Sequence, residues 1–203
     1  NRAKRFVYFS SMARYGRLEH VPFYEDMTPL PDSPYGIAKL AAEQTLRQLA
    51  RQHGMEFVIC VPHNIIGPRQ KYDDPFRNVA AIMINRMMQG QQPVIYGDGM
   101  QKRCFSFVQD ALQIMEHLTF DSKANGEIIN IGPDEEFVTI LDLARNIASI
   151  MNFDLKPDFF PARPGEARLA NCSAEKARRL FGYKTDYPLE KGLREMVEWM
   201  QAR

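Results

Sequence analysis

The sequence has 203 residues with 26 basic and 25 acidic side chains, giving a formal net charge of +1. A chain of this length forms one large domain or two small ones. The near balance of interspersed charges argues against a nucleic-acid-binding or membrane-binding surface, so we expect neither partner.

The chain opens with a predicted strand, a loop and a long helix. The strand is Arg5–Phe9, which reads RFVYF and is rich in the aromatic and β-branched residues typical of buried strands. The hydroxyl pair Ser10–Ser11 follows it directly. After a proline-containing loop, Ser33 is a candidate N-cap and a proline follows it, so we expect a helix over Pro34–His53 that ends before Gly54.

Three residues of this opening region suggest a chemical function. Tyr35 and Lys39 stand four residues apart and therefore lie on one face of the predicted helix. A free phenol has a pKa of about 10, but a neighbouring ammonium favours the phenolate. Tyr35 would then take a proton from an alcohol while a hydride leaves the carbon, with Ser11 hydrogen-bonded to the same oxygen. This arrangement fits oxidation of an alcohol by a nicotinamide cofactor.

The spacing alone is a weak signal, because Tyr187 and Lys191 have it too. That second pair straddles Pro188 at the start of the predicted last helix. No strand ending in serine precedes it, so we assign it no chemistry.

The rest of the chain alternates predicted strands with predicted helices. Further strands are expected over Glu56–Val61, Pro93–Tyr96 and Glu127–Ile131. Further helices are expected over Asn78–Met88, Val108–Leu118, Thr139–Met151, Ser173–Phe181 and Pro188–Gln201. The first of these strands is almost continuously apolar, as in a parallel sheet buried on both faces, so the pattern predicts an α/β fold.

The segments SSMARYG (residues 10–16) and SPYGIAKLAAEQ (residues 33–44) resemble the extended short-chain dehydrogenase/reductase family. The likeness is to its NAD-dependent nucleotide-sugar epimerases and dehydratases of the UDP-galactose 4-epimerase type. It continues in order through VPHNIIGPRQ, PVIYGDGMQKRCFSFVQD, GEIINIG and ARPGEARLANCSAEKA, and so covers nearly the whole chain.

The resemblance implies roles for particular residues. Ser11, Tyr35 and Lys39 would be catalytic, and the substrate would be a UDP-sugar or related nucleotide sugar. NAD is the implied cofactor, although this sequence does not distinguish NAD from NADP. Cofactor contacts are implied for Ser10, Tyr35, Lys39, Pro62 and His63. Substrate contacts are implied for Asn64, Asn78, Arg103, Arg163, Glu166 and Ala170.

Some of these positions keep a second interpretation. Arg103 and Arg163 would hold the nucleotide, since a guanidinium binds two phosphate oxygens at once, but Arg163 alone reads as a solvated surface arginine. His63 replaces a more usual aromatic residue and is expected to be structural. Cys104 and Gln109 replace acidic residues that are common at these positions in the family. We expect these replacements to affect the local stability of the chain more than its chemistry.

The resemblance also implies an architecture. It predicts the second half of a Rossmann-type parallel sheet plus a smaller, interleaved α/β domain. Residues 1–66 and 104–132 would belong to the cofactor domain, and residues 67–103 and 133–203 to the nucleotide-sugar domain, with the site between them. The helix over residues 34–53 would form a homodimer surface.

Within the family, the sequence favours a 4-epimerase. Related dehydratases and decarboxylases carry an acid just after the serine, where this chain has Met12 and Ala13, neither of which moves a proton. The small Ala170 hints that N-acetylated sugars fit. The alternatives are a nucleotide-sugar 4-reductase or other reductase of the family, and a non-catalytic fragment without bound cofactor.

The cysteines, the apolar runs and the start of the sequence bear on the cellular compartment. Cys60, Cys104 and Cys172 are odd in number and far apart, which fits reduced thiols and gives no zinc-binding spacing. No apolar run approaches the roughly 18 residues of a membrane helix, and the start NRAKRF lacks the apolar part of a signal peptide. We expect a cytoplasmic protein without a metal site.

Cofactor binding by this chain is expected to be weak or absent. The 203 residues contain no G-x-G-x-x-G or G-x-x-G-x-x-G run, the turn that places a cofactor pyrophosphate at a helix N-terminus. The family's first strands are therefore expected to be missing, and the chain to be a fragment that is inactive alone. Calorimetry of NAD binding to these residues tests this, and a micromolar or tighter dissociation constant would contradict it.

Overall fold

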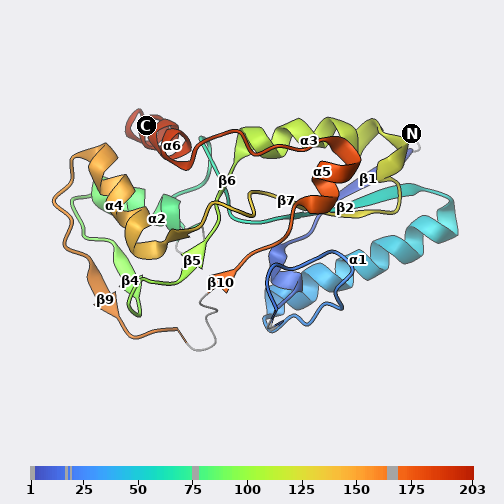
Figure 1. The fold of residues 1–203 in the computed structure, drawn as a ribbon, viewed down its shortest axis with the longest axis horizontal. Coiled ribbons are helices and arrows are strands. Elements are labelled where there is room, and N and C mark those ends of the chain that lie inside the picture. The colour runs from blue at the N-terminus through green and yellow to red at the C-terminus, as the bar shows by residue number, and fades with distance from the viewer. Residues whose placement is uncertain (1–2, 17, 19, 75–77, 164–168) are drawn as a thin grey trace. The chain divides into compact units, whose positions relative to one another are not determined.

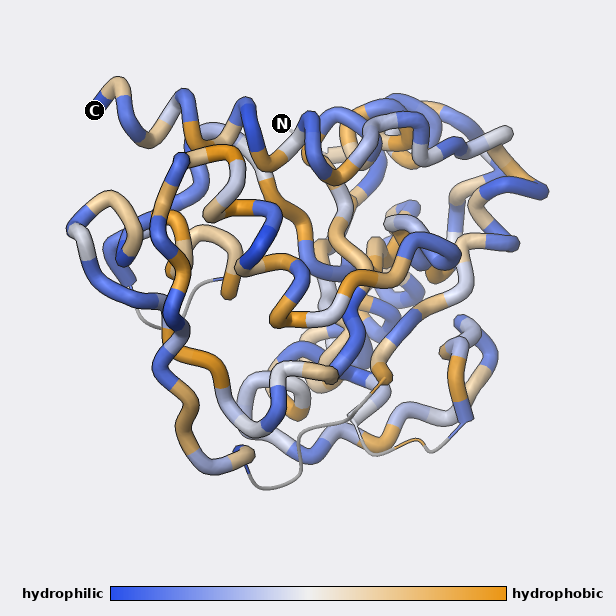
Figure 2. Tube along the Cα trace, turned by 60° about the vertical axis from the view of Figure 1, so that its left-hand side comes forward, coloured by the Kyte–Doolittle hydropathy of each residue, from blue (hydrophilic) through white to orange (hydrophobic). Residues whose placement is uncertain are grey.

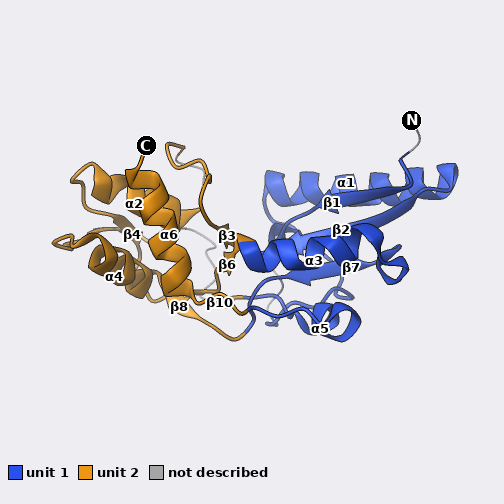
Figure 3. Ribbon diagram, turned by 90° about the horizontal axis from the view of Figure 1, so that it is seen from above, with its two compact units in different colours: residues 1–63, 109–134, 171–185 blue, residues 64–108, 135–170, 186–203 orange. Residues whose placement is uncertain are grey.

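The computed structural model describes residues 3–16, 18, 20–74, 78–163 and 169–203. The chain divides into two compact units, which Figure 3 shows in different colours. Unit 1 consists of residues 1–63, 109–134 and 171–185, and unit 2 of residues 64–108, 135–170 and 186–203.

Unit 1 is a parallel sheet covered by helices on both faces. Its strands lie in the order β1-β2-β7, with bounds β1 (Arg5–Phe9), β2 (Glu56–Pro62) and β7 (Ile128–Ile131). Figure 1 shows α1 (Pro34–His53) on one face and α3 (Val108–Phe120) on the other. The central strand is apolar on both faces, and its residues 58–61 are completely buried, as this layering requires.

The alternation of side chains along β1 links the sheet to both helix layers. The Arg5 guanidinium donates to the carbonyls of Leu118 and Asp121, at the end of α3, over 3.2 and 2.8 Å. Ser10, which lies an odd number of residues further on, faces α1 instead. The carboxyl end of β1 is therefore fixed from the α1 side.

The described part of unit 1 also contains two 3-10 turns and one short helix. These are η1 (Met12–Arg14), η2 (Ser122–Ala124) and α5 (Glu175–Phe181). The segment before α5 joins unit 1 through Phe23, whose N–H donates to the Asn171 carbonyl over 2.8 Å and whose carbonyl accepts from Ser173 over 2.9 Å. Phe23 also belongs to a hydrophobic cluster of buried residues in unit 1, which consists of Tyr15, Phe23, Leu46, Ile59, Val61, Ile128 and Cys172.

The described residues of unit 2 form three helices and several short strands. The helices are α2 (Val79–Met88), α4 (Ile140–Met151) and α6 (Leu189–Gln201). The strands are β3 (Ile65–Ile66), β4 (Val94–Tyr96), β5 (Lys102–Arg103), β6 (Ser106–Phe107), β8 (Val138–Thr139), β9 (Asp158–Phe160) and β10 (Leu169–Ala170). They pair as β10-β5-β8, β3-β6 and β4-β9.

The core of unit 2 is built from the apolar sides of its helices. Ile84 of α2, Leu143 and Ile147 of α4, and Met196 of α6 are at most 1% exposed and belong to one hydrophobic cluster. Figure 2 shows hydrophobic and hydrophilic residues alternating along α6 as it approaches the C-terminus. This is the pattern of a helix that buries one side.

The predicted α/β class with a Rossmann-like parallel sheet is confirmed. Helix α1 has the predicted bounds, because Ser33 accepts from the Gly36 N–H over 3.1 Å and Gly54 ends it at φ 61°. The two compact units and the predicted domains have different bounds. Residues 64–66 and 104–108 lie in unit 2, and residues 133–134 and 171–185 lie in unit 1. Residues 171–185, expected in the second domain, pack in unit 1 through the Phe23 contacts and through α5.

Candidate active site

Ser11 lies where the first strand of unit 1 ends. It is the N-cap of η1, and its Oγ accepts from the Ala13 N–H over 3.2 Å. Its own hydroxyl proton stays available to donate. Open α/β sheets bind ligands beyond the carboxyl ends of their strands, which is the position of this hydroxyl.

Tyr35 and Lys39 lie on the first turns of α1, beside the same strand end. Tyr35 is 57% exposed. The Lys39 ammonium donates to the Phe9 carbonyl over 2.8 Å and lies 5.7 Å from the centre of the Tyr35 ring. The Tyr8 ring lies 5.2 Å from the same ammonium, on the strand side. Lys39 is therefore held between two phenol rings, within range of cation–π attraction.

A close backbone contact brings Ser11 to this helix. A Cβ added at Gly36 would lie 2.5 Å from the Ala13 carbonyl oxygen, so only glycine lets α1 approach η1 this closely. Gly36 follows Tyr35 directly, and Ala13 belongs to the turn that Ser11 caps. The structure thus brings the three predicted catalytic residues close together in unit 1, while their roles stay a prediction.

Ser10 faces the protein interior rather than solvent. It is 3% exposed, and its hydroxyl donates to Oε1 of Glu43, which is itself 1% exposed. The Arg14 Nε lies 3.0 Å from the same carboxylate oxygen. Sequence reasoning missed Glu43 and Arg14, although Glu43 stands one helical turn after Lys39 and thus on its face. The predicted cofactor contact of Ser10 stays a prediction.

Pro62 is the last residue of β2, the strand that pairs with β1, and His63 follows it directly. Pro62 is half-buried, whereas His63 is 2% exposed and its Nε2 lies 2.7 Å from the Pro133 carbonyl oxygen. Burial lowers the pKa of His63, against the opposing effects of the Pro133 carbonyl and Asp134. The imidazole is therefore neutral near pH 7, which agrees with the structural role expected for it.

Two of the predicted substrate-binding residues make structural contacts within unit 2. Asn64 adopts φ 44°, and its amide donates to the Cys104 carbonyl over 2.9 Å. Asn78 caps α2 by accepting from the Ala80 N–H over 3.0 Å. Glu166 lies outside the residues that the structure describes.

Arg103 and Ala170 are neighbours on paired strands, since β5 and β10 align them in register. Arg163 lies elsewhere in unit 2, with its guanidinium carbon 4.0 Å above the centre of the Tyr96 ring. Both Arg163 and Tyr96 line a cavity of about 260 Å³. Its other lining residues include Arg86, Val94, Gln101 and Ile140. This cavity combines apolar walls with two guanidinium groups.

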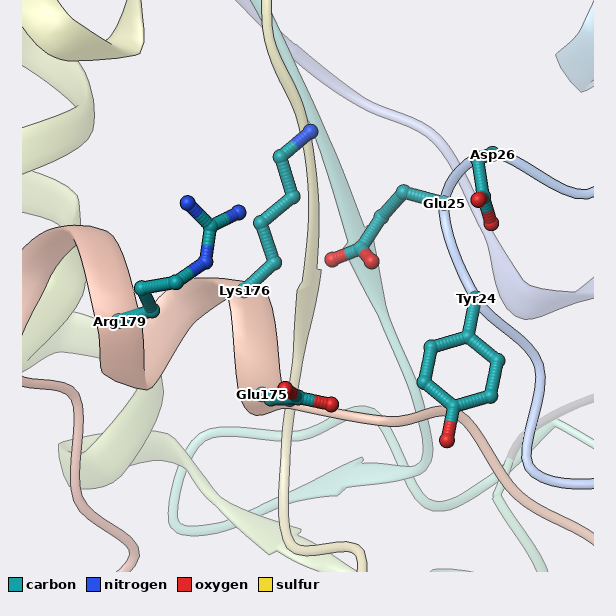
Figure 4. A pocket seen from close by; sticks show the side chains of 6 residues that line it. All are labelled: Tyr24, Glu25, Asp26, Glu175, Lys176 and Arg179. Atoms are coloured by element: carbon teal, nitrogen blue, oxygen red, sulfur yellow. The ribbon is translucent and has the colours of Figure 1, made fainter.

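A second cavity, of about 280 Å³, opens in unit 1 and is shown in Figure 4. Its lining is highly charged and consists of Tyr24, Glu25, Asp26, Glu175, Lys176 and Arg179. Glu25 accepts from the Asn130 N–H of the edge strand β7 over 2.9 Å, and burial raises its pKa. Lys176 pairs with Glu127 over 2.6 Å. These contacts indicate that the cavity lining closes the edge of the sheet.

Comparison with known proteins identifies the relatives of the chain. A model of the "NAD dependent epimerase/dehydratase family" matches residues 1–132. A solved structure of UDP-glucose 4-epimerase from Thermotoga maritima with UDP-glucose is 32% identical with a TM-score of 0.87, covering 98% of this chain and 64% of that one. UDP-glucuronic acid 4-epimerase from Bacillus cereus with UDP-glucuronic acid and NAD is 27% identical with a TM-score of 0.88, covering 100% and 63%.

Relatives with other activities match as well. UDP-N-acetyl-alpha-D-glucosaminuronate decarboxylase from Bacillus cytotoxicus is 30% identical over 210 residues, covering 98% of this chain and 64% of the relative. Dehydratases and a reductase of nucleotide sugars are also among the matches. The chain spans less than two thirds of the length of these relatives. In the part of the chain that the structure describes, no helix is long and apolar enough to cross a membrane.

The close contact at Gly36 predicts the effect of a single added methyl group. At an open helix position, Gly→Ala stabilises by about 0.5–1 kcal/mol. Here the new Cβ would press on a backbone oxygen, so we expect Gly36→Ala to lower the free energy of unfolding by about 1–3 kcal/mol. Urea denaturation measures this, with Gln48→Ala on the exposed side of α1 as the control. A more stable Gly36→Ala variant would disprove the contact.

The buried His63 predicts a pH dependence of stability. Because its pKa is lowered in the folded state, the unfolded chain binds a proton that the folded chain does not as pH falls through about 6.5. The contribution of the neutral His63 to the free energy of unfolding is therefore complete above that pH. Below it, the contribution falls by up to about 1.4 kcal/mol per pH unit.

The slope of the free energy of unfolding against pH is obtained from urea denaturation at pH 7.5 and 5.5. His63→Gln should remove the part of this slope that comes from His63. The exposed Gln52 supplies the control, since Gln52→Ala changes no titratable group and should leave the slope unchanged. Equal slopes for His63→Gln and the wild type would contradict the assignment.

Proposed function

The chain belongs to the NAD-dependent epimerase/dehydratase family, and from this we propose that the whole protein is a nucleotide-sugar 4-epimerase. One observation carries the proposal. An exposed phenol, Tyr35, lies beside the Lys39 ammonium on a helix that touches the turn capped by Ser11. This is the arrangement that proton removal from a sugar hydroxyl requires.

In the proposed reaction, Tyr35 takes the proton of the sugar C4 hydroxyl and later returns it. The Lys39 ammonium lies 5.7 Å from the centre of the phenol ring that accepts this proton. Ser11 donates a hydrogen bond to the same sugar oxygen in both directions of transfer. NAD, when bound, supplies hydride acceptance and return at C4, so that rotation of the keto sugar between the two transfers inverts C4.

The residues of unit 1 fit such a cofactor in part. Tyr35 is exposed and Lys39 is partly exposed at the carboxyl end of β1, where both would contact a nicotinamide ribose. The hydroxyl of Ser10 and the ring of His63 face Glu43 and Pro133 instead. We therefore assign cofactor contacts first to Tyr35, Lys39 and Pro62.

The cavity of unit 2 is the proposed nucleotide site. Arg163, which lies 4.0 Å above the Tyr96 ring, offers positive charge to phosphates. Arg86 lines the same cavity and is paired with Asp158 over 3.9 Å. Two of the similar epimerase structures contain UDP-glucose and UDP-glucuronic acid, which supports a UDP-sugar as substrate. Arg103 and Ala170 remain candidates for the sugar-diphosphate contacts.

Met12 and Ala13 favour epimerisation over dehydration or decarboxylation. They follow Ser11 within η1, and neither side chain transfers a proton. A reductase remains the second candidate, because a nucleotide-sugar reductase is among the relatives and needs no further acid.

A product assay on the whole protein distinguishes these functions. With NAD and a UDP-hexose, an epimerase forms the C4 epimer without net NADH consumption, whereas a reductase consumes NAD(P)H. We expect Tyr35→Phe to lower kcat by about 10²–10⁴-fold, because the proton acceptor is lost. Tyr187→Phe is the matched control, since Tyr187 has the same spacing from a lysine and should keep the wild-type rate. Net cofactor oxidation, or full activity of Tyr35→Phe, would contradict the proposal.

A further inference from the structure

Glu43 is a buried carboxylate on the helix that carries the proposed catalytic residues. It stands one turn after Lys39 and two turns after Tyr35, and it is 1% exposed. A carboxylate removed from water is costly unless donors surround it. Its partners therefore show what the position is used for.

Both partners of Glu43 come from the segment that contains Ser11. The Ser10 hydroxyl donates to Oε1, and the Arg14 Nε lies 3.0 Å from the same oxygen. Ser10 and Arg14 are each 3% exposed. Because Ser10 precedes the cap of η1 and Arg14 is the last residue of η1, one oxygen atom on α1 contacts both ends of the segment on which Ser11 lies.

Stability alone does not explain this arrangement. Replacing a buried ion pair with apolar residues of similar volume is often neutral or stabilising. The Arg14 guanidinium is also incompletely satisfied. Its buried Nε and Nη1 make no hydrogen bond, so Nε meets Glu43 as an ion pair without hydrogen-bond geometry, and the guanidinium carbon lies 5.0 Å above the Tyr15 ring. A pair that is costly to bury and gives little stability does, however, fix two segments in one relative position.

We propose that Glu43 is a positioning residue, which fixes the Ser11 hydroxyl relative to the helix that carries Tyr35 and Lys39. Ser10 remains attached to the sheet without Glu43, because its N–H donates to the Cys60 carbonyl over 2.8 Å. Among the described residues the η1 turn makes no such backbone bond to the sheet. It is held instead by Glu43, by the Gly36 contact and by the Tyr15 hydroxyl, which donates to Asn130 of β7. The purpose of this positioning rests on the proposed function, but the positioning itself is measurable without activity.

Amide hydrogen exchange on the chain, followed by NMR, tests the proposal. The Ala13 N–H donates to Ser11 Oγ and the Tyr15 N–H to the Met12 carbonyl, so both amides report on this turn. In the double variant Arg14→Met/Glu43→Met, we expect these two amides to exchange at least about tenfold faster. The α1 amides and the thermal midpoint should stay near wild-type values. Gln44→Met, at the exposed neighbour of Glu43, is the control and should change nothing.

Two outcomes would overturn the proposal. One is unchanged exchange at Ala13 and Tyr15, and the other is an equal acceleration along α1 and the turn, which a merely stabilising pair would produce. Glu43→Asp, which keeps the charge but shortens the side chain, gives the same comparison if the double variant does not fold.

A kinetic measurement on the whole protein separates this proposal from the proposed function. A lower kcat with unchanged KM in Glu43→Asp supports positioning, and equal kcat values contradict it. If the wild type has no epimerase activity, the proposed function fails while the exchange result still decides the positioning.

Discussion

The close approach of α1 to the η1 turn is the constraint on which the candidate site depends. Only a residue without a side chain at Gly36 allows the Ala13 carbonyl oxygen to lie where a Cβ would be. Once this contact sets the register, the turns of α1 that follow meet the end of β1 in order. Lys39 reaches the Phe9 carbonyl, and Glu43 reaches Ser10. The helical repeat of 3.6 residues thus aligns one helix face with consecutive residues of the strand end.

A second set of buried hydrogen bonds holds the other side of this segment. The Tyr15 hydroxyl donates to Asn130 Oδ1 over 2.9 Å, and the Asn130 amide donates to the Phe23 carbonyl over 3.1 Å. Burial raises the pKa of Tyr15, so the phenol stays protonated and able to donate. Since Glu25 accepts from the Asn130 N–H, the residues after η1 are anchored to the edge strand β7. The η1 turn, which Ser11 caps, is therefore fixed to α1 on one side and to the edge strand β7 on the other.

The sequence predicted the elements that have long-range patterns and missed those that depend on contacts. The bounds of α1 were predictable because Ser33 and Gly54 mark its ends. Two-residue strands such as β5 and β10 have no periodicity, so only their pairing defines them. The spacing of Tyr187 and Lys191 also places an ammonium 4.4 Å from a ring centre, yet that phenol hydrogen-bonds Glu195 and its ring stacks on Phe107. Spacing therefore predicts proximity, whereas the surrounding contacts decide exposure and use.

The burial of Glu43 also bears on which reaction the site can support. Dehydration and decarboxylation need a further proton-transferring group near the substrate. Glu43 is the carboxylate closest in sequence to Tyr35 and Lys39 on α1, but its burial among Ser10 and Arg14 prevents it from reaching a substrate. Met12 and Ala13 offer no such group either. The exposed phenol of Tyr35 lies beside the Lys39 ammonium at the end of β1. Under the proposed function these two groups would serve the transfer of one proton to and from one hydroxyl.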